Sequence, residues 1–373
     1  MRKTFLSYFR GMKDHRINRQ KQHPLENIVA IATVAAICNM ETWKDISDFG
    51  KAKQAFFSKF LDLTNGIPSK DTFRRFFSAL DPQVFEFHFL QWARSLSENI
   101  NGEVVSIDGK TIRLASRMRE NNKSIHLISA WASSNRLILG QVKTDEKSNE
   151  ITAIPTLLEA LFLEGTTVTI DAMGCQKNIV EKIVEKNADY VLALKENHPT
   201  LLEDVTRSFD KKPCHEFYQT LDCGHGRIEE RKCSIITDLD FLLDRNSWKN
   251  LYSIVRIESQ RIIKKTGVVQ KETRYYISSL TTVEKISNAI RCHWGVENKV
   301  HYCLDVIFGE DSSSKREGFA AQNFSLLNKI VLNLIRKHED IDNNEYRKKS
   351  SVKSKRRLAG YHDAYLFELL NLI

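Results

Sequence analysis

The 373-residue chain is poor in the residues and runs that mark several broad protein classes. It has only 6 prolines and 15 glycines, which excludes collagen-like and low-complexity chains. Its longest apolar run, at residues 28–38, is about half of the roughly 20 residues that a membrane-spanning helix needs, so it predicts a buried helix. The residues before this run are mixed and include Asp14 and Glu26, unlike a signal peptide. We therefore expect a cytoplasmic protein with no membrane-spanning segment.

Cysteine usage excludes a disulfide framework. The seven cysteines are odd in number and scattered through a large chain, which predicts reduced thiols. Cys214, Cys223 and Cys233 lie 9 and 10 residues apart, without the close cysteine pair of a zinc site, so we expect no metal there.

Charge is more informative, because 56 basic and 47 acidic residues give a net charge of +9. This excess favours polyanionic partners such as nucleic acid or an anionic membrane surface.

Residues 1–99 predict a helical domain at the amino terminus. Aromatic residues such as Phe73, Phe76 and Phe77 recur at helical spacing, which indicates a core face rather than a platform for stacking bases. The turn at residues 65–68 separates two helices, and we expect the second of them to begin near Ser69.

From residue 103 the pattern changes to the order β-β-β-α-β-α-β. The expected strands are 103–107, 124–131, 136–143, 166–170 and 190–194, and the expected helices are 151–163 and 176–186. Hairpin strands followed by right-handed βαβ crossovers build a mixed five-stranded sheet with helices packed on it. We therefore assign residues 100–199 to an α/β domain within a chain that is α+β overall.

The remaining residues fall into three regions. Residues 200–280 contain alternating, turn-punctuated runs and predict an all-β insertion. Residues 281–340 return to helices, one from residue 281 to about 302 and one over about 317–338. Residues 341–373 form a basic carboxyl-terminal extension. Within it, residues 347–357 hold seven basic and no acidic residues, so we expect no core there, only phosphate contacts or a solvated linker.

Three acids are the candidates for chemistry. Asp108 and Asp171 each follow an apolar strand, so each is either a metal ligand at the rim of a sheet or part of a turn. Glu297 lies on the helix that begins at residue 281, and steps of four place it on one face with His293 and His301. An acid on a largely apolar helix face needs an ion pair or a metal ion to offset its burial.

Carboxylates from two strands and one helix suit a two-metal site for phosphoryl transfer, because several carboxylates offset the repulsion between two Mg²⁺ ions. Two alternatives stay open. His293, Glu297 and His301 could hold zinc, although the chain has no HExxH motif there and the strand aspartates would go unexplained. Glu310 or Asp311 could be the third acid, although both lie where we expect the chain to leave the helix.

Several motifs follow one another in a specific order along nearly the whole chain. They are residues 41–50, 65–68, 107–111 (IDGKT), 144–155 (TDEKSNEITAIP), 171–176 (DAMGCQ), 225–227 (HGR), 274–279 (RYYISS) and 293–311. Together they resemble the DDE transposases of the H-repeat-associated insertion-sequence family. The resemblance implies a ribonuclease H-like fold, split by the β insertion before the helix with the last acid.

The resemblance also implies a function and a site. Asp108, Asp171 and Glu297 would be the catalytic and metal-binding triad, using two Mg²⁺ ions with Mn²⁺ as a possible substitute. The implied protein is a DNA transposase that binds insertion-sequence ends, cleaves the phosphodiester bond and joins the 3′-hydroxyl to target DNA. Its partners would be double-stranded DNA and a second copy of itself, with no membrane. His293 stands where related transposases have an arginine, which implies a phosphate contact.

We further expect DNA contacts from the amino-terminal domain and from six basic residues: Lys110, His225, Arg227, His293, Arg356 and Arg357. For His225 and Arg227 a tight hairpin turn explains the sequence equally well. Two rival functions remain at this point. One is a metal-dependent nuclease without strand transfer, and the other is a non-catalytic DNA-binding descendant of a transposase.

Overall fold

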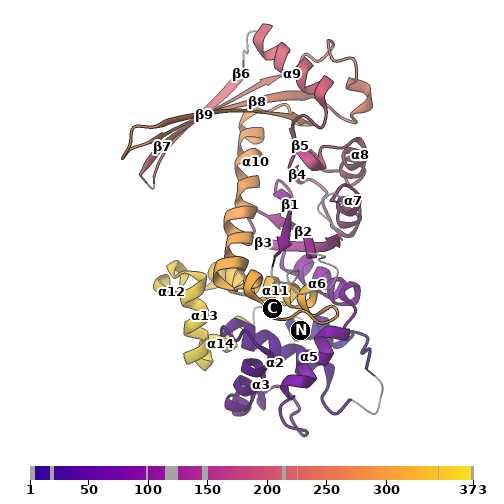
Figure 1. The fold of residues 1–373 in the computed structure, drawn as a ribbon, viewed down its shortest axis with the longest axis vertical. Helices are drawn as coiled ribbons and strands as arrows, with labels where there is room; N and C mark the ends of the chain where they lie inside the picture. Colours follow the sequence, from indigo (N-terminus) through magenta and orange to yellow (C-terminus); the bar gives the residue numbers. More distant parts are fainter. Residues whose placement is uncertain are drawn as a thin grey trace.

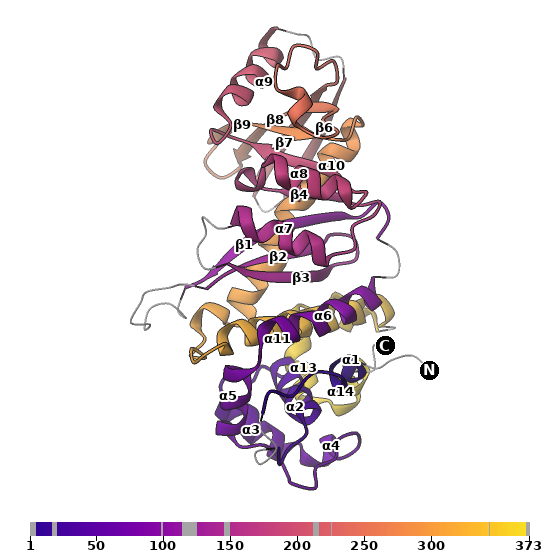
Figure 2. The same ribbon diagram turned by 90° about the vertical axis from the view of Figure 1, so that its right-hand side faces the viewer.

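The computed structural model describes residues 5–16, 21–97, 100–113, 125–144, 150–211, 216–224, 226–342 and 344–370. Along its long axis the molecule has a helical lobe at one end, a mixed α/β layer in the middle and a β extension at the other end (Figure 1). One helix, α10 (Val283–Gly295), runs from the β extension past the middle layer toward the helical lobe. Segments from both ends of the chain build that lobe (Figure 2).

The helical lobe forms around an apolar and aromatic core. Its first part consists of α1 (Phe5–Arg10), α2 (Leu25–Ile37), α3 (Trp43–Ala52), α4 (Gln54–Phe57), α5 (Lys70–Ala79) and α6 (Pro82–Leu96). The side chain of Ser69 caps α5, and Phe73, Phe76 and Phe77 on that helix are buried, so the predicted helix start and core face are both confirmed. Helix α2 is buried along nearly its whole length, as its apolar run predicts. Within the described ranges, no helix is both long and apolar enough to cross a membrane.

The middle layer has the predicted order of elements. It contains β1 (Val104–Ile112), β2 (Ile125–Ala132), β3 (Leu137–Thr144), α7 (Glu150–Ala160), β4 (Thr167–Ile170), α8 (Lys177–Glu185) and β5 (Asp189–Leu194). In space the strands lie in the order β3-β2-β1-β4-β5. Strand β1 is antiparallel to β2 and parallel to β4, which is the ribonuclease H-like arrangement expected from the resemblance. Helices α7 and α8 cover one face of the sheet and α10 covers the other (Figure 1).

The predicted β insertion differs from expectation in two ways. It begins with a helix, α9 (Pro199–Lys211), before β6 (Glu216–Gly224), β7 (Arg227–Ile236), β8 (Ser253–Ile263) and β9 (Val269–Ser278). In addition, β9 pairs with β5, so these strands continue the core sheet to nine strands in the order β3-β2-β1-β4-β5-β9-β8-β7-β6. The physical reason is that the outer edge of β5 would otherwise leave a row of backbone groups unpaired.

The carboxyl-terminal region is not a coreless tail, and that prediction is wrong. Helices α11 (Ala320–Ile341), α12 (Glu345–Lys349), α13 (Val352–Tyr361) and α14 (Asp363–Leu370) pack into the helical lobe (Figure 2). Tyr365 and Leu366 on α14 are part of its core, and Lys355 and Arg356 on α13 are buried.

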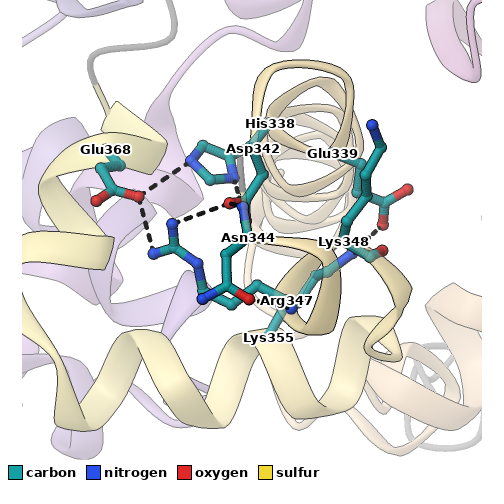
Figure 3. Close-up of polar contacts among 8 residues, drawn as sticks. All are labelled: His338, Glu339, Asp342, Asn344, Arg347, Lys348, Lys355 and Glu368. Atoms are coloured by element: carbon teal, nitrogen blue, oxygen red, sulfur yellow. Dashed lines mark hydrogen bonds and ion pairs between the residues drawn. The ribbon is translucent and has the colours of Figure 1, made fainter.

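Acids outside residues 347–357 pair with two basic residues of this stretch, Arg347 and Lys355. Figure 3 shows Arg347 between two carboxylates, 2.9 Å from Asp342 Oδ1 and 3.0 Å from Glu368 Oε2. The amino group of Lys355 is ion-paired with Glu339 on α11 in the same way. Because these acids lie outside residues 347–357, the composition of that stretch alone could not predict that it folds.

Candidate active site

Asp108 on β1 and Asp171, directly after β4, follow the last paired residues of two neighbouring parallel strands. Ile107 on β1 is opposite Ile170 on β4, so the two aspartates that follow share one edge of the parallel pair. Strand β1 does not end at Asp108, because its antiparallel pairing with β2 continues to Ile112. Asp108 is therefore held within a strand, beyond the point where β4 has ended, and the alternative that it belongs to a turn is wrong.

Backbone N–H groups orient both aspartates. Asp108 Oδ1 accepts a hydrogen bond of 2.9 Å from the N–H of Gly109. Asp171 Oδ1 accepts bonds of 3.1 and 3.4 Å from the N–H groups of Met173 and Gly174, at the start of a short 3₁₀ turn. One oxygen of each carboxylate is thus fixed by the main chain.

The helix that carries Glu297 changes its form at the site. Helix α10 contacts β1 and β4 and ends at Gly295, and the chain continues in π-helical turns at Val296–His301 and Cys303–Ile307. Such turns are rare and are frequently found at functional sites. The sequence predicted a helix to about residue 302, but could not predict this change of hydrogen bonding.

His301 lies between the carboxylates of Glu297 and Asp108. His301 Nδ1 lies 3.0 Å from Glu297 Oε2 and 3.6 Å from Asp108 Oδ2. One ligand atom from each of Asp108, Glu297 and His301 lies within 4.8 Å of the others. The side chain of Glu297 is 62% exposed, whereas that of His301 is 5% exposed. The group is therefore buried at His301 and open to solvent at Glu297.

The site holds an excess of negative charge. Burial raises the pKa of Asp108 to about 7, and repulsion from Asp171, Glu297 and Glu150 acts in the same direction against the hydrogen bond from Gly109. A divalent cation that binds between such carboxylates relieves their mutual repulsion. Oxygen donors of this kind fit Mg²⁺ or Mn²⁺.

His293 contacts β4, the strand that precedes Asp171, and is partly buried. Its Nδ1 is 3.1 Å from Thr169 Oγ1 on β4, and burial lowers its pKa. The metal group of the described residues contains His301 but not His293, so the open zinc alternative with both histidines does not correspond to the observed cluster.

The alternative third acids occupy a separate cluster around Lys110. Its amino group is ion-paired with the buried carboxylate of Glu310, lies 2.6 Å from Asp305 Oδ1 and is 3.9 Å from Asp311 Oδ1. The Lys110 ammonium holds the pKa of Glu310 down despite the opposing effect of burial. Glu310 and Asp311 thus face a lysine and not the aspartates, which favours Glu297 as the third acid.

Comparison with known families agrees with this geometry. Residues 101–334 match the transposase DDE domain, and residues 6–93 match the domain described as DDE_Tnp_1-associated. The chain belongs to the DDE transposase family. Two relatives from Escherichia coli K12 are each 37% identical to the transposase over 377 residues, covering 99% of this chain and 98% of their own. They are the putative protein YbfL and the H repeat-associated putative transposase YhhI.

A cryo-EM structure of a piggyBac transposase synaptic complex with hairpin DNA aligns with 97% of this chain and 78% of its own. Its sequence identity is 10% and its TM-score is 0.42, so it adds nothing to the assignment.

The residues of the transposase that were expected to contact DNA differ in their exposure to solvent. Arg227 and Arg357 are exposed, whereas His225 lies outside the described residues. Lys110 is enclosed by the acids named above. Arg356 is 2% exposed, and its guanidinium donates to the backbone carbonyls of Ala36 and Ile307, so the expectation of a DNA contact there is wrong. It joins α13 to the rest of the helical lobe instead.

A groove of about 930 Å³ lies between α10 and one face of the β extension. Trp294, Asn298 and Lys299, which flank Glu297 along the chain, are among its lining residues. Trp294 is 49% exposed and stacks under the guanidinium of Arg274, 4.6 Å from the ring centroid. Basic residues outnumber acids in the groove, because three acids, Glu229, Glu272 and Glu284, lie among seven basic residues: Arg227, Arg231, Arg261, Lys271, Arg274, Arg291 and Lys299.

The sequence reasoning predicted only Arg227 among these. A signal was present, because the lining residues alternate along β7 and β9, as at Arg227, Glu229 and Arg231, and at Glu272 and Arg274. Alternation of this kind marks one face of a strand. It could not show that the face turns toward α10.

Proposed function

We propose that this transposase cleaves DNA phosphodiester bonds at the ends of its element and joins the freed 3′-hydroxyl to target DNA. The observation that carries the proposal is the meeting of Asp108 and Glu297 beside Asp171. These acids come from three segments that lie 63 and 126 residues apart in the sequence. Acids so far apart in the chain, in a protein of this family, support a shared catalytic role.

The donor set supports two Mg²⁺ ions, with Mn²⁺ as a substitute. Asp108, Asp171 and Glu297 would hold the ions, which would supply activation of the attacking oxygen and stabilisation of the leaving oxygen in an in-line displacement. Asp108 and Asp171 each keep one oxygen on backbone N–H groups and have the other for a cation. Glu297, on the open side, approaches from the direction in which DNA would enter.

The basic groove supports double-stranded DNA as the substrate. We propose that the DNA end lies along the groove, with phosphates near Arg227, Lys271 and Lys299, so that the scissile phosphate reaches Glu297. His293 would contact a phosphate through Nε2, because its Nδ1 is bonded to Thr169. Arg357 remains a proposed contact on an exposed helix face. Joining two element ends in one event favours a homodimer, and we propose that it acts in the cytoplasm.

A strand-transfer assay tests the chemistry. A duplex from the DNA that flanks the gene, carrying a free 3′-hydroxyl, is incubated with plasmid and Mg²⁺ or Mn²⁺. We expect joined products from the wild type and none from Asp108→Asn, Asp171→Asn or Glu297→Gln, with duplex binding retained. Glu203→Gln, an exposed acid on α9, is the matched control and should join DNA normally. Nicks without joined products would support a nuclease instead, and binding without any product would support a non-catalytic role.

A titration with salt tests the groove. Each phosphate contact that is removed should lower the slope of log K against log salt by about 0.9. We therefore expect Lys271→Ala with Lys299→Ala to reduce the slope by about 2. Lys285→Ala removes an exposed lysine of α10 outside the groove, and should leave the slope unchanged. Equal slopes for all three proteins would place the DNA elsewhere.

A further inference from the structure

His301 is a buried histidine whose polar contacts are with two acids of the proposed site. Only 5% of its side chain is exposed, and its Nδ1 faces Glu297 Oε2 at 3.0 Å and Asp108 Oδ2 at 3.6 Å. Its other nitrogen, Nε2, is buried without a hydrogen-bond partner among the described residues. A ring this enclosed, with its polar edge toward two carboxylates, requires an explanation beyond packing.

The two separations that involve His301 are close to the spacing of neighbouring ligands around one ion. Metal–ligand bonds of about 2.0 to 2.1 Å at right angles, as in octahedral sites, place neighbouring donor atoms about 3 Å apart. The observed separations of 3.0 and 3.6 Å need only small side-chain shifts to reach this value. All three donors lie within 4.8 Å of one another.

We propose that His301 is itself a metal ligand, which binds through Nδ1 the ion held by Asp108 and Glu297. The inference rests on the proposed function, because it adds a nitrogen donor to the carboxylates that the function requires. The π-helical turn Val296–His301 presents both Glu297 and His301 to Asp108, so one irregular segment supplies two of the three ligands.

A nitrogen donor changes which ion the site prefers. Mg²⁺ and Mn²⁺ both favour oxygen ligands, but a nitrogen donor is less favourable for the harder Mg²⁺ than for the transition-metal ion Mn²⁺, so a site with one histidine discriminates in favour of Mn²⁺. We therefore expect the full-length protein to bind Mn²⁺ more tightly than Mg²⁺. Removing the imidazole should reduce that preference.

The alternative role of His301 is only to position Glu297 by a hydrogen bond. His301→Asn separates the two roles, because the asparagine amide can still donate to Glu297 but has no imidazole nitrogen. His293→Asn is the matched control, since it removes the neighbouring histidine and leaves His301 in place. Thermal denaturation of both variants verifies that each is folded.

Pulsed electron paramagnetic resonance of bound Mn²⁺ distinguishes the ligand role of His301 from the positioning role, because it detects a directly coordinated nitrogen without any turnover. We expect nitrogen modulation in the wild type and in His293→Asn, and its loss in His301→Asn. The Mn²⁺ affinity of His301→Ala should fall about tenfold or more. Competition with Mg²⁺ should show a smaller preference for Mn²⁺ in His301→Asn.

Three outcomes have different meanings. Bound Mn²⁺ without nitrogen modulation in the wild type would overturn the role of His301 and leave the carboxylate site intact. Nitrogen modulation that persists in His301→Asn and disappears in His293→Asn would assign the nitrogen to His293 and also overturn the inference. If the wild type and Asp108→Asn bind Mn²⁺ equally weakly, both the inference and the proposed metal site fail.

Discussion

Replacing Asp108 with asparagine should stabilise the metal-free protein while abolishing its chemistry. The side chain of Asp108 is only 25% exposed, and burial is the largest cause of its pKa of about 7. Ionising this carboxyl therefore destabilises the folded state when no cation is present. Asparagine has the same shape and can still accept the hydrogen bond from the N–H of Gly109. The substitution removes the charge and little else.

The stability that Asp108→Asn gains over the wild type depends on pH. Below pH 3.8, the ordinary value for an aspartate, the carboxyl is neutral in the folded and the unfolded chain, and above about pH 7 it is charged in both. Between these values only the unfolded chain releases the proton, so the wild type loses stability as the pH rises. With about 1.36 kcal/mol per pH unit, the full loss is about 4 kcal/mol.

The assay is urea denaturation in EDTA at pH 5, 6, 7 and 8. The advantage of Asp108→Asn in the free energy of unfolding should grow by about 1.4 kcal/mol per pH unit up to pH 7 and then level off. Glu203→Gln, on an exposed face of α9, should show almost no change with pH. Excess Mn²⁺ should stabilise the wild type and not Asp108→Asn. An advantage that is constant with pH, or a variant less stable than the wild type at pH 8, would refute the reasoning.

Three further substitutions test contacts around the site and the helical lobe. Lys110→Met leaves Glu310 buried without its closest cation and should cost about 3 to 5 kcal/mol in urea denaturation, with partial recovery in the double variant with Glu310→Gln. Arg356→Ala should cost about 2 to 4 kcal/mol, because charged hydrogen bonds to two carbonyls are lost, whereas Arg357→Ala should change the thermal midpoint little. Gly109→Ala should cost about 1 to 3 kcal/mol, since its new methyl group would collide with the buried histidine and glutamate behind β1, and an unchanged thermal midpoint would contradict that close approach.

Local patterns were sufficient to predict most elements of the core. The strands and helices from β1 to β5 follow the hydrophobic periodicity because each buries a face that its own residues define. The periodicity also located Asp108 and Asp171 after apolar runs. It stopped β1 too early, at Ile107, because the strand continues to Ile112 by pairing with β2, where Ile112 lies opposite Ile125. A partner strand sets that length, and a local pattern does not contain it.

Contacts between distant segments could not be predicted in the same way. Lys110 is a basic residue close to Asp108 in the sequence, which suggested a phosphate contact. In the structure, three acids about 200 residues later in the chain surround it. Arg356 lies in the most basic stretch of the chain, but its guanidinium is bonded to the carbonyl of Ala36. His301 was visible at a spacing of four from Glu297, but its approach to Asp108 depends on how α10 crosses the sheet. Charge counts along the chain do not identify the partners of a charge.

The course of α10 connects the proposed DNA groove to the proposed chemistry. This helix contacts β6 and β7 of the β extension at one part of its length and β1 and β4 at another, and it lines the groove before the chain reaches Glu297. Strand β9 is hydrogen-bonded to β5, so the opposite wall of the groove belongs to the same sheet that carries Asp108. A shift of the β extension would therefore move one wall of the groove relative to α10 and the acids. Because Trp294 lines the groove and lies three residues before Glu297 on one continuous segment, DNA bound in the proposed groove would contact the segment that carries the third acid.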